Sequence, residues 1–175
     1  MALGATIVRL VLDVADGDRS YWATHELTLA QHPSESDARV MVRVAAFALN
    51  AHEDLAFTKG MNVDDEPELW RRSATNEIER WIDFGQLDER RIRKACGRAR
   101  EVIVYTYAAR KAEAWWKGVA PKLERFDNLV VAHLDDAGLG GLYGRNLHLQ
   151  ASIDGGELHL GDGTRSVTVV PRRRD

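Results

Sequence analysis

The chain has 175 residues, a formal net charge of -3 and 45% hydrophobic residues. This length suits one domain with a full hydrophobic core, and the mild acidity lowers the expectation of a nucleic-acid-binding protein without excluding one. The single cysteine excludes a disulfide framework and a cysteine zinc site. No apolar run reaches the length of a membrane span and no secretory leader is recognisable, so we expect a cytoplasmic protein without a membrane partner.

Residues 5–30 predict two strands joined by a turn. Apolar residues alternate with polar ones from Val8 to Val14, and Ala15-Asp16-Gly17-Asp18 has the composition of a turn. The return strand ends at His32-Pro33, where proline removes a backbone donor.

A helix is predicted next, with Ser34 as its cap and Asp37 where a capping box carries an acid. Apolar residues surround most of its girth as far as Ala51, which is typical of a central helix covered on several sides. A short strand from Leu55 to Thr58, closed by Lys59-Gly60, follows it.

The most informative stretch is a strand predicted over residues 77–85, preceded by the acidic segment 64–68. At strand period, Ile78, Ile82 and Phe84 share one face, and the other face carries Glu77, Glu79, Trp81 and Asp83. Neighbouring carboxylates repel unless a cation lies between them. The pattern therefore indicates a divalent-metal site, a charged binding face or, most simply, the solvated face of an edge strand.

A basic helix follows, with Asp88 as the expected N-cap. Arg90, Lys94 and Arg98 recur at helical spacing and are expected to share one face. Such a row can contact a phosphate backbone, or it can simply offset nearby acids.

The second half predicts a partly parallel sheet followed by an antiparallel meander. Buried strands at 102–105 and 129–132 flank a helix over roughly 110–118, and the strand-helix-strand order favours right-handed crossovers. From Gly138, glycine-rich turns separate short alternating segments. We expect one α/β domain over residues 1–170 with a mixed β-sheet, and a frayed basic tail over 171–175.

Other chemistries have little support in the sequence. The six histidines show no metal-ligand spacing, and Cys96 lies on an apolar helix stripe, where a packed inert thiol is expected. No phosphate loop, dinucleotide fingerprint or Gly-x-Ser-x-Gly elbow is present, so we expect no nucleotide cofactor.

Several longer motifs carry a family resemblance. They are Ala5-Thr6-Ile7, His32-Pro33-Ser34-Glu35, Phe57-Thr58-Lys59-Gly60, Asp64-Asp65-Glu66-Pro67, Trp81-Ile82-Asp83-Phe84-Gly85-Gln86, Arg91-Ile92-Arg93-Lys94-Ala95-Cys96-Gly97 and Tyr105-Thr106-Tyr107. On these motifs the chain resembles the bacterial YaeQ family over essentially its whole length. The resemblance implies a restriction-endonuclease-like core, similar to PD-(D/E)XK nucleases, in the order αβββαβ.

The resemblance also implies site residues. Glu68 and Asp83 match the two acids of the nuclease pattern, which would hold Mg²⁺ or Mn²⁺. The pattern's lysine falls at Gly85, so Gln86 or Lys94 would have to replace it in catalysis.

Two functions follow. One is a divalent-metal-dependent phosphodiesterase acting on nucleic acid, in which the ion activates a bound water. The alternative is a catalytically inactive nuclease-like scaffold that acts as a binding protein, because a fold does not carry its function with it. The sequence leaves the oligomeric state open.

Overall fold

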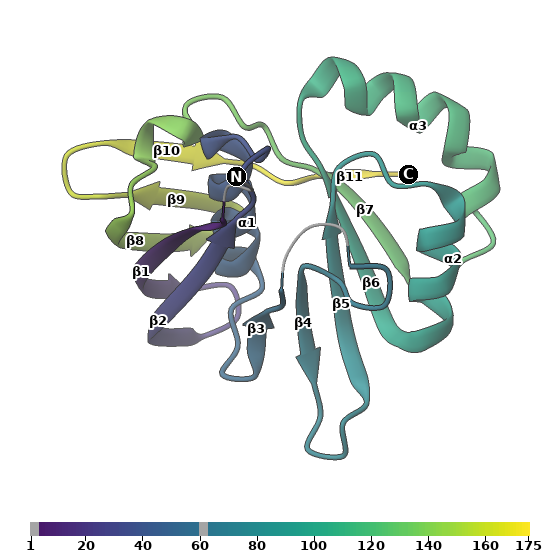
Figure 1. Ribbon diagram of the computed structural model, residues 1–175, viewed down its shortest axis with the longest axis horizontal. Helices are drawn as coiled ribbons and strands as arrows, with labels where there is room; N and C mark the ends of the chain where they lie inside the picture. The colour runs from purple at the N-terminus through teal and green to yellow at the C-terminus, as the bar shows by residue number, and fades with distance from the viewer. Residues whose placement is uncertain (1–3, 60–62) are drawn as a thin grey trace. The chain divides into compact units, whose positions relative to one another are not determined.

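Two β-sheets and three α-helices make up the part of the chain that the computed structural model describes, residues 4–59 and 63–175 (Figure 1). The chain divides into two compact units. The first runs to Ala51 and resumes over Asp136–Pro171, and the second holds His52–Asp135 and Arg172–Asp175. The mixed α/β class is confirmed, and the strands form two sheets, each with parallel and antiparallel pairs.

The first unit is built on a five-stranded sheet in the order β10-β9-β8-β1-β2. Its strands are β1 (Thr6–Asp16), β2 (Tyr21–Gln31), β8 (Asn146–Asp154), β9 (Glu157–Gly161) and β10 (Ser166–Val169). The predicted hairpin is confirmed, with a loop over 17–20, and β8, β9 and β10 form the predicted antiparallel meander. The unpredicted feature is that β1 pairs in parallel with β8, which joins the two ends of the chain in one sheet.

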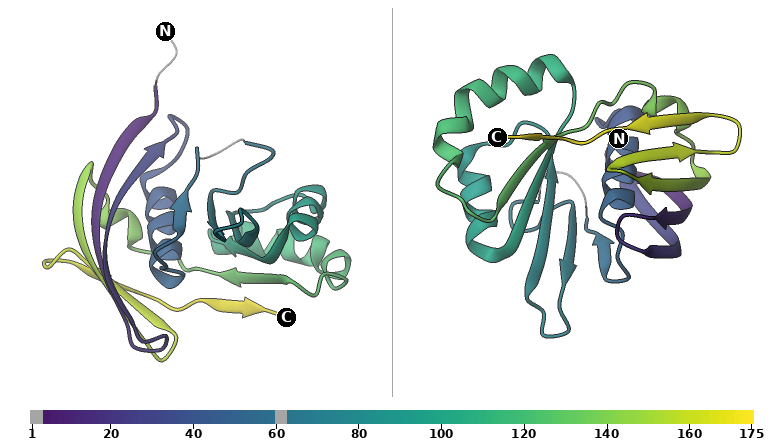
Figure 2. Two further views of the ribbon diagram at one scale, coloured as in Figure 1. Left: turned by 90° about the horizontal axis from the view of Figure 1, so that it is seen from below. Right: turned by 180° about the vertical axis from the view of Figure 1, so that it is seen from behind.

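One face of this sheet is apolar and lies against α1 (Asp37–Leu49), as Figure 2 shows. Val8, Leu10 and Leu12 of β1 are buried, as alternation predicts, and so are Leu158 and Leu160 of β9. The short 3₁₀ helix η1 (Leu139–Leu142) also contacts α1.

The N-terminus of α1 differs from the prediction. Ser36, not Ser34, is the N-cap, and its hydroxyl accepts a hydrogen bond from Arg39 N at 3.2 Å. Asp37 instead accepts from the Gln31 side chain at 3.0 Å. The preceding Glu35 is buried in an ion pair, which explains why the helix starts later than its sequence pattern does.

The second unit is a six-stranded sheet in the order β11-β7-β6-β5-β4-β3. Its strands are β3 (Leu55–Phe57), β4 (Leu69–Arg72), β5 (Ile78–Phe84), β6 (Ala99–Thr106), β7 (Leu129–His133) and β11 (Arg172–Arg174). β5, β6 and β7 are parallel, as predicted, and β3, β4 and β5 are antiparallel. Gly60, expected to close the β3 strand, lies outside the described residues.

The two crossover helices α2 (Glu89–Arg98) and α3 (Ala109–Leu123) cover the same face of this sheet (Figure 1). Asp88 caps α2 as predicted, accepting from Arg91 N at 2.8 Å. α3 continues past Pro121, beyond its predicted end. A core of Trp81, Ile92, Val102, Val104 and Val131 fills the layer between sheet and helices.

The last residues were expected to fray, and that prediction is wrong. Arg172–Arg174 form β11, which pairs antiparallel with β7 through Arg173 and Ala132. Backbone hydrogen bonds to β7 at the edge of the sheet therefore order this basic segment, despite its charge. No helix within the described residues combines the length and the apolarity needed to cross a membrane.

Candidate functional site

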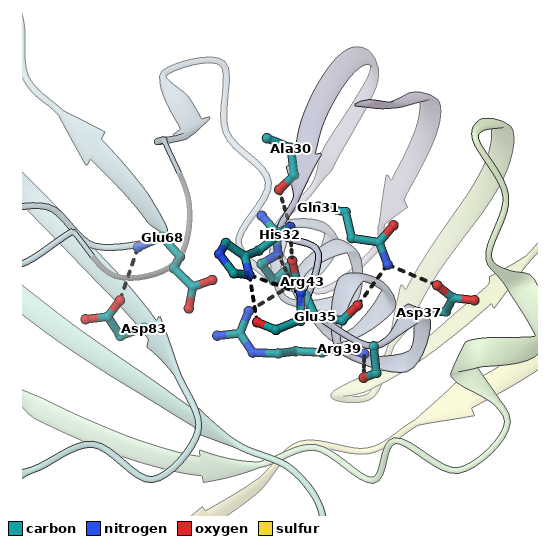
Figure 3. Close-up of polar contacts among 11 residues, drawn as sticks. Ala30, Gln31, His32, Glu35, Asp37, Arg39, Arg43, Glu68 and Asp83 are labelled. Atoms are coloured by element: carbon teal, nitrogen blue, oxygen red, sulfur yellow. Dashed lines mark hydrogen bonds and ion pairs between the residues drawn. The ribbon is translucent and has the colours of Figure 1, made fainter. Parts of the chain in front are cut away.

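The structure brings together the two acids that the sequence singled out. β4 and β5 are antiparallel neighbours with Leu69 opposite Ile82, so Glu68 and Asp83 come next to each other at the end of the pair. Glu68 N donates a hydrogen bond to Asp83 Oδ1 at 3.1 Å (Figure 3). Both residues are buried, at 5% and 1% exposure.

Hydrogen-bond donors surround the Asp83 carboxylate. Oδ1 accepts from Glu68 N and from Arg91 Nη2, at 3.1 Å each. Oδ2 accepts from Trp81 Nε1 and from Arg91 Nε, at 2.9 Å each. Arg91 therefore binds the carboxylate in a bidentate manner, the strongest geometry for such a pair.

Arg91 also holds the segment that precedes β4. Its Nη1 donates to Val63 O and its Nη2 to Glu66 O, at 3.0 Å each. Half-burial alone would lower the pKa of Arg91, but the hydrogen bond and charge of Asp83 outweigh it and the pKa is raised. The guanidinium is thus a permanent cation beside Asp83.

This arrangement does not fit a divalent cation at Asp83. A carboxylate offers about four lone-pair sites, and four donors already use those of Asp83. Within residues 4–59 and 63–175 no group of three or more histidine, cysteine, aspartate or glutamate side chains is arranged to hold a metal ion. The predicted Mg²⁺ or Mn²⁺ site at Glu68 and Asp83 therefore finds no support in this geometry.

Lys94 and Gln86, the two candidates for the missing lysine, point elsewhere. Lys94 Nζ forms an ion pair with Asp65 Oδ1 and contacts Asp64 O at 3.4 Å. Gln86 follows Gly85, whose φ of +90° ends the strand, and its side-chain amide donates to Tyr107 O at 3.4 Å. Of the four predicted catalytic residues, only Glu68 and Asp83 share a location, and the catalytic roles of all four stay a prediction.

The basic face of α2 is divided differently from the prediction. Arg91, Lys94 and Arg98 form the row that contacts the acidic segment, with Arg98 Nη1 donating to Asp65 O at 2.7 Å. Arg90, expected in a row with Lys94 and Arg98, lines the same cleft as Lys94, but its side chain pairs with none of the described acids. Offsetting nearby acids, the simpler interpretation of this helix, therefore holds for three of its cations.

Two cations of α2 have no such role. Arg90 and Arg93 are exposed and form no ion pair or side-chain hydrogen bond with any residue that the structure describes. They border a surface cleft of about 510 Å³. Among the described residues its lining is Asp64, Asp88, Arg90, Arg91, Arg93 and Lys94, so four cations face two acids in that part of the cleft.

Arg91 is the functional residue that sequence reasoning missed. Its position three residues after the N-cap Asp88 was a usable signal, because a capping box places an acid there and this chain places a cation. Arg91 lies on the first turn of α2, and from there its side chain contacts Asp83 near the end of β5.

A second buried ion pair lies in the first unit (Figure 3). Arg43 Nε and Nη2 donate to the two carboxylate oxygens of Glu35 at 2.9 and 3.0 Å, and Arg39 Nη1 donates to Glu35 Oε1 at 2.9 Å. The Glu35 and Arg43 side chains are each 1% exposed. Arg43 also donates to Ala30 O, so this pair ties β2 to α1.

Known proteins are similar to this chain over nearly its full length. The model of a family described as YaeQ protein matches residues 1–171. A protein of Escherichia coli (strain K12), described as uncharacterized protein YaeQ, is 44% identical over 172 residues, covering 97% of this chain and 95% of its own.

Two crystal structures are also similar. The YaeQ protein from Xanthomonas axonopodis pv. citri is 46% identical with a TM-score of 0.92, and 98% of each chain is covered. The YaeQ protein from Pseudomonas syringae is 27% identical with a TM-score of 0.91, covering 98% of this chain and 96% of that one.

Proposed function

The chain belongs to the YaeQ family, and we propose that it is a non-catalytic nucleic-acid-binding protein built on a nuclease-like scaffold. In this proposal an arginine occupies the acidic site that a nuclease would use for metal. The cleft beside that site contacts phosphates.

The element order supports the nuclease-like scaffold. Along the chain, α1, β3, β4, β5, α2 and β6 follow one another in the αβββαβ order that the resemblance implies. β3, β4 and β5 are antiparallel, and α2 is the crossover to the parallel strand β6. Of the two acids of the nuclease pattern, Glu68 immediately precedes β4 and Asp83 lies near the end of β5.

The observation that carries the absence of catalysis is the bidentate contact of Arg91 with Asp83. A metal-dependent phosphodiesterase needs its carboxylates free to bind the ion. Here the side chain that would be one ligand is 2% exposed and already neutralised. Removing Arg91 would leave Asp83 buried without its counterion, which costs about 3–5 kcal/mol.

The observation that favours nucleic acid is that the guanidinium groups of Arg90 and Arg93 have no partner within residues 4–59 and 63–175. Phosphate contacts come largely from arginine and lysine side chains, and they need no base recognition. The modest charge of the cleft predicts weak, salt-sensitive binding.

The binding test is fluorescence anisotropy with labelled single-stranded DNA, duplex DNA and RNA over a range of salt concentrations. We expect the logarithm of the association constant to fall linearly with the logarithm of the salt concentration. In an Arg90→Ala/Arg93→Ala variant the slope becomes shallower by about 2, because each lost phosphate contact contributes about 0.9. The matched control, Arg110→Ala/Lys117→Ala, removes two exposed charges from α3 and keeps the slope.

The cleavage test uses the same substrates with Mg²⁺ or Mn²⁺. We expect no cleavage by the parent protein. Cleavage that disappears in an Asp83→Ala variant would overturn the proposal in favour of the phosphodiesterase, whose supporting observation is the adjacency of Glu68 and Asp83. Absence of binding to every substrate would equally refute the proposed function.

A further inference from the structure

A cavity of about 300 Å³ lies in the second unit between α3, β7 and β11. The apolar side of its lining is made by Trp116, Leu123, Phe126, Leu129 and Val131. The volume is at the lower end of the range for small-molecule sites, which are mostly apolar with a few placed polar groups. The cavity is independent of the α2 cleft, since the two share no lining residue.

Arg174 of β11 is the least exposed of the charged residues that line this cavity. Its Nη1 donates to Glu113 Oε2 at 3.0 Å, and its guanidinium carbon lies 5.9 Å from the centre of the Trp116 ring. Arg174 Nε is buried and has no hydrogen-bond partner, and it is the one such buried side-chain atom among the described residues. Buried donors are nearly always paired, so an unpaired one beside a cavity calls for an explanation.

The unused donors of Arg174 define the ligand that would fit. With Nη1 taken by Glu113, the edge formed by Nε and Nη2 has no partner among the residues that the structure describes. This edge matches a carboxylate, which accepts two parallel hydrogen bonds from a guanidinium. The rings of Trp116 and Phe126 suit an aromatic body.

The surrounding charges are nearly balanced. Arg173 and Asp175 line the cavity and face each other at 3.7 Å, and the exposed Glu124 is a further acid at its rim. Long-range attraction therefore contributes little, and recognition depends on the short-range fork of Arg174.

We propose that this cavity binds a small aromatic carboxylate, with its ring between Trp116 and Phe126 and its carboxylate on the Nε–Nη2 edge of Arg174. Such a ligand supplies the acceptor that Arg174 Nε lacks. It also removes the exposed parts of both rings from water.

The test titrates 2-naphthoate into the full chain, followed by NMR signals of the Trp116 indole N–H and the Arg174 Nε–H. We expect both signals to shift and 2-naphthamide, the neutral isostere, to bind about tenfold more weakly. Arg174→Lys keeps the charge but lacks the fork, and should weaken naphthoate binding about tenfold. Arg172→Lys, on the same strand but outside the cavity lining, should bind like the parent.

The outcomes are decisive because Arg174→Lys is a mild change whose fold is checked by the rest of the same spectrum. No shift of the Trp116 and Arg174 signals at about 1 mM naphthoate, which would mean no useful affinity, overturns the proposal. Equal binding of the amide, or of the Arg174→Lys protein, overturns the role given to the carboxylate and its fork.

Discussion

Arg91 binds Asp83 through two parallel hydrogen bonds, from Nε at 2.9 Å and Nη2 at 3.1 Å. A cation of α2 and an acid of β5 thus form one ion pair. The Asp83 side chain is 2% exposed and that of Arg91 23%. The pair links α2, β5 and the segment before β4. Its loss should therefore lower the stability of the second unit.

Arg91→Met should therefore lower the free energy of unfolding by about 3 kcal/mol, because it leaves Asp83 buried without its counterion. Asp83→Asn in the same background should cost little more, since the charge that needed the partner is gone. Urea denaturation of the parent, both single variants and the double variant gives the coupling energy. Strictly additive losses would contradict a coupled pair.

Glu35→Gln should destabilise the first unit by about 3–5 kcal/mol, because it removes the carboxylate that Arg43 contacts in a fully buried position. Arg39→Gln is the matched comparison, since it breaks one contact of the same carboxylate by a side chain that is 12% exposed. We expect it to cost about 1 kcal/mol. Thermal unfolding of both variants measures the difference, and equal losses would refute the central role of the Arg43 contact.

Burial raises the pKa of the Cys96 thiol from 9.0 to about 11. Because the folded pKa is the higher one, the thiol's contribution to stability is complete below pH 9.0 and is lost as the pH rises towards 11. In the folded protein the rate of alkylation by iodoacetamide should keep rising through about pH 10. In urea the rate should level off at a lower pH, near the ordinary thiol pKa. A plateau at the same pH in both states would contradict the shift.

Asp65→Asn should strengthen binding to DNA about threefold at low salt, because it removes an acid that pairs with Lys94 at the edge of the cleft. The hydrogen bond and charge of Lys94 lower the pKa of Asp65, so this acid is ionised at neutral pH. Both side chains are exposed, so the substitution should leave the stability of the fold nearly unchanged.

Asp127→Asn provides the control for Asp65→Asn, since it makes the same charge change at an exposed residue outside the cleft lining. Anisotropy titrations of both variants compare them directly. An equal gain in affinity would mean that net charge, not the cleft, determines binding.

Local patterns predicted most of the elements, because alternation and capping depend on neighbouring residues. The alternation from Val8 to Val14 and the cap at Asp88 follow from such patterns. The parallel pairing of β5 with β6 follows from the strand-helix-strand order. Long-range pairings had no local signal. The parallel register of β1 with β8 and the return of Arg172–Arg174 to β7 depend on chain segments far apart in sequence.

The site shows the same division. Period two placed Trp81 and Asp83 on one strand face, and their side chains do hydrogen-bond. The strand pattern did not predict that Arg91 contacts Asp83. A sequence does not distinguish one arginine of a basic helix from another without knowledge of its partner. Arg91 and Arg90 are adjacent in sequence, yet one neutralises a buried acid and the other is exposed.

The parallel pairing of β1 with β8 has a consequence for synthesis. Arg9 lies beside Asn146, so during translation the first hairpin has to wait for most of the chain before its second edge is covered. Until then an open strand edge with a long apolar face is available to other chains, which is the usual route to aggregation. Nascent chains that stop before β8 should therefore depend most on chaperones, although the second unit's three parallel strands are already complete.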